Sequence, residues 1–326
     1  MSATFLGRTC SHARAGAVVA ILLATACRSQ PAASRLFVSN ESAGTVSVID
    51  AHSTKTLATI PVGDQPRGLR VSRDGRTLFV ALRGAHSIGV VDLTQLRLVD
   101  TIPSGRGPEA FDLVGDRFIV VSNEETQAAT IVDVNARKVR ATITVGNAPD
   151  GVAAAPDGSV WITNEADNTV SVIDPRAARV VATLATGMRP RGIAFNHKLG
   201  VVTGESDASV TIVDIAAREA IARVQLPMTG VTPPQPVGVA IDAAGRYAYV
   251  TTGNAGSIAV IDLEAHRLAR VIEHVGHRPS AITLGRDGLL YTANGPGNDI
   301  AAIDPRSGLV VRRIAAGDSP GDITSL

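Results

Sequence analysis

Acidic residues recur along this chain of 326 residues at a spacing that could gather their charges on one surface. Glu124, Glu165 and Glu205 follow one another at intervals of 41 and 40 residues, and Asp167 and Asp207 stand two positions beyond the last two. Carboxylates gathered in a concave rim raise the local negative potential and attract a cation or a basic partner. The alternative is that they are ordinary solvated side chains at loop tips.

A second set of charged residues directly follows a proline. It comprises Arg67, Glu109, Asp150 and Arg191, and the corresponding residues further along the chain are Val237, Ser280 and Gly321. Glu109 and Asp150 would extend the acidic group, whereas Arg67 and Arg191 flank it and could neutralise part of its charge. We expect these positions and the three glutamates to form one binding surface for a partner or a small ligand.

Two histidines stand close together in the sequence in one short segment only, Glu273-His274-Val275-Gly276-His277. Histidine and carboxylate side chains could hold a divalent metal ion, but in an extended strand His274 and His277 would point to opposite sides unless a turn begins between them. The Cys-x-x-Cys-His motif of covalent haem is absent from the sequence. We therefore predict no cofactor and leave a divalent cation open as the alternative.

A sequence repeat indicates the strands that must position these residues. A strand of the form V-x-V-[VI]-D recurs with its aspartate at Asp50, Asp92, Asp133, Asp174, Asp214, Asp262 and Asp304, in steps of 42, 41, 41, 40, 48 and 42 residues. Each step has the length of four short antiparallel strands with their turns, which is one blade of a β-propeller. Aspartate after a strand caps a turn, so we expect a structural role for these seven.

One repeat predicts strands over residues 66–71, 77–82, 88–92 and 96–102. The chain begins its repeats with a second strand at residues 35–40 and ends with a lone first strand at residues 320–326. We therefore predict an all-β, seven-bladed β-propeller over residues 35–326, closed by three N-terminal strands and one C-terminal strand. Antiparallel order then places the acidic group and the residues after the prolines on one face, the top face, with the residues after the prolines near the central channel.

Three segments carry a resemblance to a known family. Residues 36–40 (LFVSN), 160–164 (VWITN) and 168–174 (NTVSVID), with V-G-x-x-P elements such as residues 145–149, resemble YVTN-repeat, YncE-like β-propellers. The resemblance covers residues 35–326 and implies a seven-bladed propeller. Members of this family look like binding or surface proteins without a shared catalytic motif, so we expect a non-catalytic binding or scaffold protein that engages its partner at the top rim.

An enzyme remains the alternative. The segment Pro156-Asp157-Gly158-Ser159-Val160-Trp161 is similar to streptogramin lyases, which use histidine with a magnesium ion. That resemblance implies a periplasmic enzyme of the lyase or lactonase kind assisted by a divalent metal. Glu273, His274 and His277 would then be its catalytic residues.

The first 26 residues have the pattern of a signal peptide. Arg8 and Arg14 precede the apolar stretch 15–26, and Ala24-Thr25-Ala26 forms a cleavage signal before Cys27. The stretch resembles a bacterial lipobox, although Ala24 stands where leucine is usual. We expect lipidation of Cys27, a tether over residues 27–34 and a membrane-anchored protein of the bacterial cell envelope, facing the periplasm or the cell surface. Plain signal-peptidase cleavage is the alternative.

Charge narrows the class of partner. Removal of residues 1–26 takes away Arg8 and Arg14 and no acidic residue, so the formal net charge changes from +1 to −1. A nearly neutral domain is a poor ligand for nucleic acid, whose binding depends on neutralising phosphates. We therefore expect a monomer that binds an envelope protein or a small ligand, and no nucleic acid.

Overall fold

The computed structural model describes residue 1, residues 34–228 and residues 232–326. The predicted signal peptide, Cys27 and almost all of the predicted tether lie outside the described residues. Among those described, no helix has the length and apolar character needed to cross a membrane. Export, lipidation and the boundary at residue 26 therefore stay predictions.

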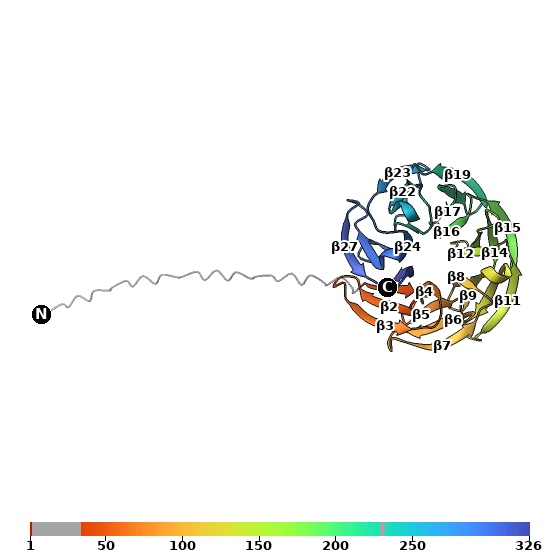
Figure 1. The fold of residues 1–326 in the computed structure, drawn as a ribbon, viewed down its shortest axis with the longest axis horizontal. Coiled ribbons are helices and arrows are strands. Elements are labelled where there is room, and N and C mark those ends of the chain that lie inside the picture. The colour runs from red at the N-terminus through yellow and green to blue at the C-terminus, as the bar shows by residue number, and fades with distance from the viewer. Residues whose placement is uncertain (2–33, 229–231) are drawn as a thin grey trace. The chain divides into compact units, whose positions relative to one another are not determined.

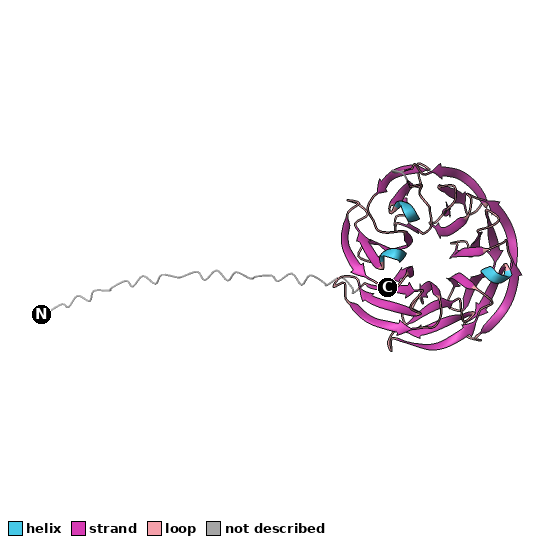
Figure 2. Cartoon of the chain, viewed as in Figure 1, coloured by secondary structure: helices cyan, strands magenta, loops and turns pink. Residues whose placement is uncertain are grey.

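Residues 34–228 and 232–326 form seven four-stranded antiparallel sheets arranged around a central axis (Figure 1), and strands make up nearly all the regular structure (Figure 2). In chain order the first four blades are β4(Pro66–Val71), β5(Thr77–Leu82), β6(Ser87–Asp92) and β7(Arg97–Pro103); β8(Pro108–Val114), β9(Phe118–Asn123), β10(Ala128–Asp133) and β11(Lys138–Thr144); β12(Pro149–Ala154), β13(Val160–Asn164), β14(Thr169–Asp174) and β15(Arg179–Ala185); β16(Pro190–Phe195), β17(Leu199–Gly204), β18(Ser209–Asp214) and β19(Glu219–Gln225). The next two are β20(Val239–Ile241), β21(Tyr247–Thr251), β22(Ile258–Asp262) and β23(Arg267–Ile272); β24(Pro279–Leu284), β25(Leu290–Asn294), β26(Asp299–Ile303) and β27(Val310–Ala315). Three short 3-10 helices, η1(Glu124–Thr126), η2(Gly253–Ala255) and η3(Gly295–Gly297), lie in top-face loops.

The seventh blade closes the ring as predicted. It joins β1(Arg35–Asn40), β2(Thr45–Asp50) and β3(Thr56–Pro61) to the C-terminal strand β28(Pro320–Ser325). β28 pairs antiparallel with β1, with Phe37 opposite Thr324 and Val38 opposite Ile323. This pairing removes the open sheet edge that an unclosed ring would expose at β1.

The core lies between neighbouring blades. Trp161 of β13 is fully buried and meets Phe195 of β16 edge to face, with ring centroids 5.3 Å apart. Val172 of β14 and Val202 of β17 belong to the same apolar cluster. Because each cluster joins two blades, no blade can bury its faces without its neighbours, and the ring must form as a unit.

The repeat aspartates have the structural role that the sequence indicated. Each accepts hydrogen bonds from main-chain N–H groups in the turn that follows its strand, at 2.6 to 3.1 Å. Asp174, for example, accepts from Arg176 and Ala177. These bonds lower the pKa of Asp174 from its ordinary value of 3.8 because they stabilise the ionised carboxylate.

Candidate binding site at the channel mouth

Hydroxyl groups of the second strands hold the inner strands around the axis. Thr163 Oγ1 accepts from the Gly151 N–H at 2.8 Å and donates to the Arg191 carbonyl of the next blade at 3.0 Å. Thr203 joins Gly192 to Val237 in the same way, at 2.8 and 2.9 Å. Similar bonds run from Ser122 to Ala110 and Asp150 and from Thr251 to Gly238 and Ser280. These hydroxyls therefore fix the backbone at four of the positions after the prolines.

Glycine allows the inner strands to approach so closely. A Cβ added to Gly151 would collide with the carbonyl oxygen of Arg191, and one added to Gly192 would collide with that of Val237. In these two inner strands the proline and the glycine two positions later thus set the angle at which the residue between them enters the channel.

The axis of the ring holds a cavity of about 840 Å³. All seven positions predicted to lie near the channel line it, namely Arg67, Glu109, Asp150, Arg191, Val237, Ser280 and Gly321. A second cavity of about 470 Å³ lies at the mouth and shares Arg67, Glu109, Asp150, Arg189 and Arg191 with the first. The prediction that these positions face the channel is confirmed.

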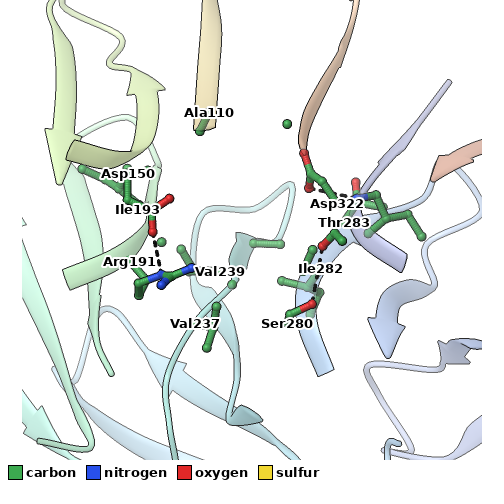
Figure 3. A pocket seen from close by; sticks show the side chains of 18 of the residues that line it. Ala110, Asp150, Arg191, Ile193, Val237, Val239, Ser280, Ile282, Thr283 and Asp322 are labelled. Atoms are coloured by element: carbon green, nitrogen blue, oxygen red, sulfur yellow. Dashed lines mark hydrogen bonds and ion pairs between the residues drawn. The ribbon is translucent and has the colours of Figure 1, made fainter. Parts of the chain in front are cut away.

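The wall of the channel has two parts. The four blades from β4 to β19, together with Glu41 of the closing blade, present ionised side chains, and we call this part the charged sector. The two blades from β20 to β27 present Val237, Val239, Ser280 and Ile282 and only one charged lining residue, Arg278; we call these the apolar sector. Figure 3 shows Asp150 and Arg191 on the wall of the cavity, with Val237 and Val239 of the next blade beside them.

Two groups of ion pairs lie at the mouth of the charged sector. In the first, Arg67 contacts Glu41 at 2.9 Å and Glu109 at 3.4 Å. Arg83 pairs with Glu109 and contacts Glu124 at 2.6 Å. Each guanidinium in this group thus lies between two carboxylates, and Glu109 is shared by both.

The second group is centred on Arg191. Its guanidinium contacts Asp150 at 2.6 Å, Glu165 at 3.3 Å and Glu205 at 3.8 Å. Arg189 pairs with Glu165 and lies 3.4 Å from Glu205. We call these two groups together the paired cluster.

Within the paired cluster, burial and the neighbouring positive charge have opposite effects on the pKa of Asp150. Burial raises the pKa of Asp150 above its ordinary value of 3.8, and the positive charge of Arg191 opposes that rise. The negative charge of Asp150 in turn raises the pKa of Arg191. The Asp150 carboxylate and the Arg191 guanidinium therefore stabilise each other's charged forms where little water reaches them. Loss of either group would leave the other as a buried charge without its partner.

The predicted acidic group comes together only in part. Glu109, Glu124, Asp150, Glu165 and Glu205 meet at the mouth, but arginines separate them. Glu205 is only 9% exposed, so the alternative of solvated loop tips is wrong for this residue. The expectation that Arg67 and Arg191 neutralise part of the charge is confirmed.

Asp167 and Asp207 are not part of the paired cluster. Asp167 accepts from the main-chain N–H of Asn147 at 2.7 Å and from its side-chain amide at 2.8 Å. Asp207 accepts from the Met188 N–H at 2.7 Å and pairs with Arg223. Both carboxylates therefore hold the loops that lead into inner strands.

Three members of the cluster are not among the site residues predicted from the sequence: Glu41, Arg83 and Arg189. Glu41 and Arg83 occupy the same repeat position as Glu124, Glu165 and Glu205, so the repeat alone could have marked them. Arg189 directly precedes Pro190, a position that arginine holds in one other repeat, at Arg278 before Pro279. Only the fold shows that it reaches Glu165.

A smaller charged group lies deeper in the channel. Arg70 contacts Asp112 at 3.4 Å and Asp322 at 3.6 Å. Asp322 also accepts from the Leu69 N–H at 2.8 Å, and Asp112 accepts from the Ala154 N–H of the neighbouring blade at 2.9 Å. Because these carboxylates hold adjacent inner strands together, we assign them a structural role, with Asp322 joining the closing strand to β4.

The histidine segment lies apart from the cavities. Glu273, His274 and His277 are exposed in the top-face loop between β23 and β24, and none of them lines either cavity. His274 has a left-handed backbone, and its carbonyl accepts from Arg313 at 3.1 Å. Within residues 34–228 and 232–326, no three histidine, cysteine or carboxylate side chains are grouped so that they could hold a metal ion.

The fold and the mouth define a seven-bladed β-propeller with a central, ligand-sized cavity. Comparison with known proteins agrees: residues 68–158 match the family model described as a YNCE-like beta-propeller. Over that stretch the chain is similar to YncE-like propellers, and the predicted resemblance is confirmed. A comparison with curated proteins finds no match.

Two solved structures share the fold. Hydrazine synthase of Kuenenia stuttgartiensis superposes with a TM-score of 0.74 and 22% identity, covering 82% of this chain and 92% of that one. A functionally unknown protein from Desulfotomaculum acetoxidans superposes with a TM-score of 0.77 and 16% identity, covering 89% of this chain and 98% of that one. At these identities the likeness concerns the fold alone.

Proposed function

We propose that this protein is a binding protein of the bacterial cell envelope that engages a partner or a small ligand at the mouth of its central channel. The observation that supports this most directly is the cavity of about 840 Å³, which combines a charged wall with an apolar one. Ligand sites are typically concave, largely apolar and equipped with a few placed polar groups. The channel mouth fits that description.

The arrangement favours binding over catalysis. The carboxylates of the mouth are engaged in ion pairs with arginines of the protein itself, as Asp150 is with Arg191 at 2.6 Å. The candidate catalytic residues of the enzyme alternative lie in an exposed loop beyond the cavities. No observation favours that alternative.

The test is to fill the cavity without changing its charge. Ser280 lines the apolar sector, and Ser280→Trp would place an indole in the channel. Val99 of the outer strand β7 is 42% exposed, so Val99→Trp adds the same group far from the mouth. Components of an envelope extract that bind the wild-type protein and the Val99→Trp variant should be lost with Ser280→Trp. Equal capture by all three proteins would show that the mouth is not the binding surface.

We also propose that the protein is anchored through lipidated Cys27. Acyl chains would supply nearly all the membrane affinity, so Cys27→Ser should move the protein from the membrane fraction into the soluble envelope fraction. Ser29→Ala, two residues along, is the matched control and should leave fractionation unchanged. A wild-type mature protein whose mass shows no lipid would instead support the plain signal peptide.

A further inference from the structure

The charges around the channel do not balance. The side chains that line the two cavities include eight carboxylates, Glu41, Glu109, Asp112, Glu124, Asp150, Glu165, Glu205 and Asp322. They include six guanidiniums, Arg67, Arg70, Arg83, Arg189, Arg191 and Arg278. Two negative charges are therefore in excess, and a bound cation would offset them.

One carboxylate oxygen at the mouth is left without a donor. Glu205 is 9% exposed, and its Oε2 has no hydrogen-bond partner among the described residues. Its nearest cationic atoms are Arg189 Nε at 3.4 Å and Arg191 Nη1 at 3.8 Å. A buried carboxylate oxygen without a hydrogen bond costs free energy, which a donating ligand would recover.

Three other atoms of the cluster also lack a well-oriented hydrogen bond, but their groups are satisfied in other ways. Arg191 Nε lies 2.6 Å from Asp150, and Glu109 Oε1 contacts Arg83. Arg67, whose Nε is unbonded, donates through Nη1 to Glu41 at 2.9 Å. Glu205 Oε2 is therefore the open acceptor of the mouth.

The residues around Glu205 favour an organic cation over a metal ion. The blade of Glu205, β16–β19, adjoins the next blade along the chain, whose Val237 and Val239 line the cavity. Figure 3 shows these two valines beside Arg191, which belongs to the same blade as Glu205. The apolar wall continues to Ile282 on the next blade. A metal ion would find no group of three ligating side chains in the described part of the chain. An apolar body that carries one N–H donor fits both the open oxygen and the wall.

We propose that the mouth binds a primary ammonium group carried on an apolar chain, with the ammonium donating to Glu205 Oε2 and the chain lying along Val237, Val239 and Ile282. This inference rests on the proposed function and names the chemistry of its ligand. The ammonium could belong to a small alkylamine or to a lysine side chain of a partner protein.

The test is calorimetric titration of the purified protein with n-hexylamine, with 1-hexanol and hexanoate as probes of the same length. Hexylamine should bind at least ten times more tightly than either. Glu205→Gln keeps the shape of the side chain, removes its charge and should weaken hexylamine binding at least tenfold. Glu264→Gln makes the same change at an exposed position outside the cavities and should alter binding less than twofold.

A second variant covers the event that Glu205→Gln does not fold. Val237→Lys places a tethered ammonium beside the mouth and should block hexylamine while the unfolding midpoint stays near that of the wild type. Nα-acetyl-lysine amide binding as tightly as hexylamine would assign the ammonium to a partner's lysine, and tighter binding of hexylamine would assign it to a small amine.

Hexanoate binding more tightly than hexylamine, unchanged hexylamine binding in Glu205→Gln, or no amine binding at all would overturn the inference. The proposed function has its own readout. If Ser280→Trp still abolishes capture while no amine binds, the mouth is a binding site for another chemistry. If neither effect is seen, both proposals are wrong.

Discussion

The charged and apolar sectors of the channel are built by the same repeat, and the residue that follows the inner-strand proline differs between them. Arg191 and Val237 both follow a proline, and a second-strand threonine binds the carbonyl of each, Thr163 at 3.0 Å and Thr203 at 2.9 Å. Arg191 nevertheless contacts three carboxylates, whereas Val237 contributes only apolar surface. The repeat therefore sets where a side chain stands, and the individual residue sets what the wall can bind.

The largest expected effect comes from removing the strand that closes the ring between the two sectors. β28 packs against β24 of the apolar sector and β4 of the charged sector. Deleting residues 320–326 should expose the edge of β1 and cost on the order of 5 kcal/mol or more of the free energy of unfolding. Chemical denaturation followed by circular dichroism measures this. A truncated protein as stable as the wild type would contradict the closure.

The next effect compares the two sectors directly. Arg191→Ala would leave Asp150, Glu165 and Glu205 without their shared cation and should destabilise the protein by roughly 1–3 kcal/mol. Val237→Ala, at the same repeat position, removes two methyl groups from a half-buried side chain and should cost about 1 kcal/mol or less. Denaturant midpoints of the two variants measure the difference. Equal losses would mean that the ion pairs add nothing beyond packing.

The hydroxyl groups should act alike in both sectors. Thr163→Val and Thr251→Val keep the side-chain shape and remove the bonds to Gly151 and Arg191 or to Gly238 and Ser280. Each substitution should cost about 1–2 kcal/mol of the free energy of unfolding. A loss confined to one sector would show that the two walls are held differently, which would break the comparison.

The smallest expected effect is the pH dependence of stability that comes from single carboxyl groups. Burial raises the pKa of Asp150 above 3.8, whereas main-chain bonds lower that of Asp174 in its turn. Between 3.8 and its raised pKa the folded protein binds the proton of Asp150 more tightly than the unfolded chain does, so the stability that this group contributes falls as pH rises. For Asp174 the sign reverses: its contribution is present above 3.8 and lost as pH falls. Carboxyl resonances followed by NMR should titrate above 3.8 for Asp150 and below it for Asp174.

Much of the fold followed from local pattern. The segment 77–82 was predicted as a strand and coincides with β5, and the segment 35–40 coincides with β1. These predictions succeed because a repeat of four short strands allows one architecture and because Asp-Gly and Asp-capped turns mark where each strand ends. The pairing of β1 with β28 was equally predictable, since the phase of the repeat leaves one strand missing at one end and one spare at the other.

The paired cluster was harder to predict because its contacts cross blades. Glu41 lies 26 residues from Arg67 and belongs to another sheet, and Arg189 stands outside the repeat position that marks the glutamates. Spacing could place the carboxylates on one rim. It could not show that arginines separate them, because the reach of a guanidinium depends on the distance between neighbouring blades.

The sequence by itself determined the seven blades, the closure and the face on which the glutamates lie, because strand period, turn chemistry and repeat phase are local properties of the chain. The tertiary structure alone decided that the acidic residues are held in ion pairs, that Asp167 and Asp207 support loops, and that Glu205 keeps an open oxygen beside an apolar wall. Those outcomes depend on distances between side chains that are far apart in the sequence, which only the folded ring sets.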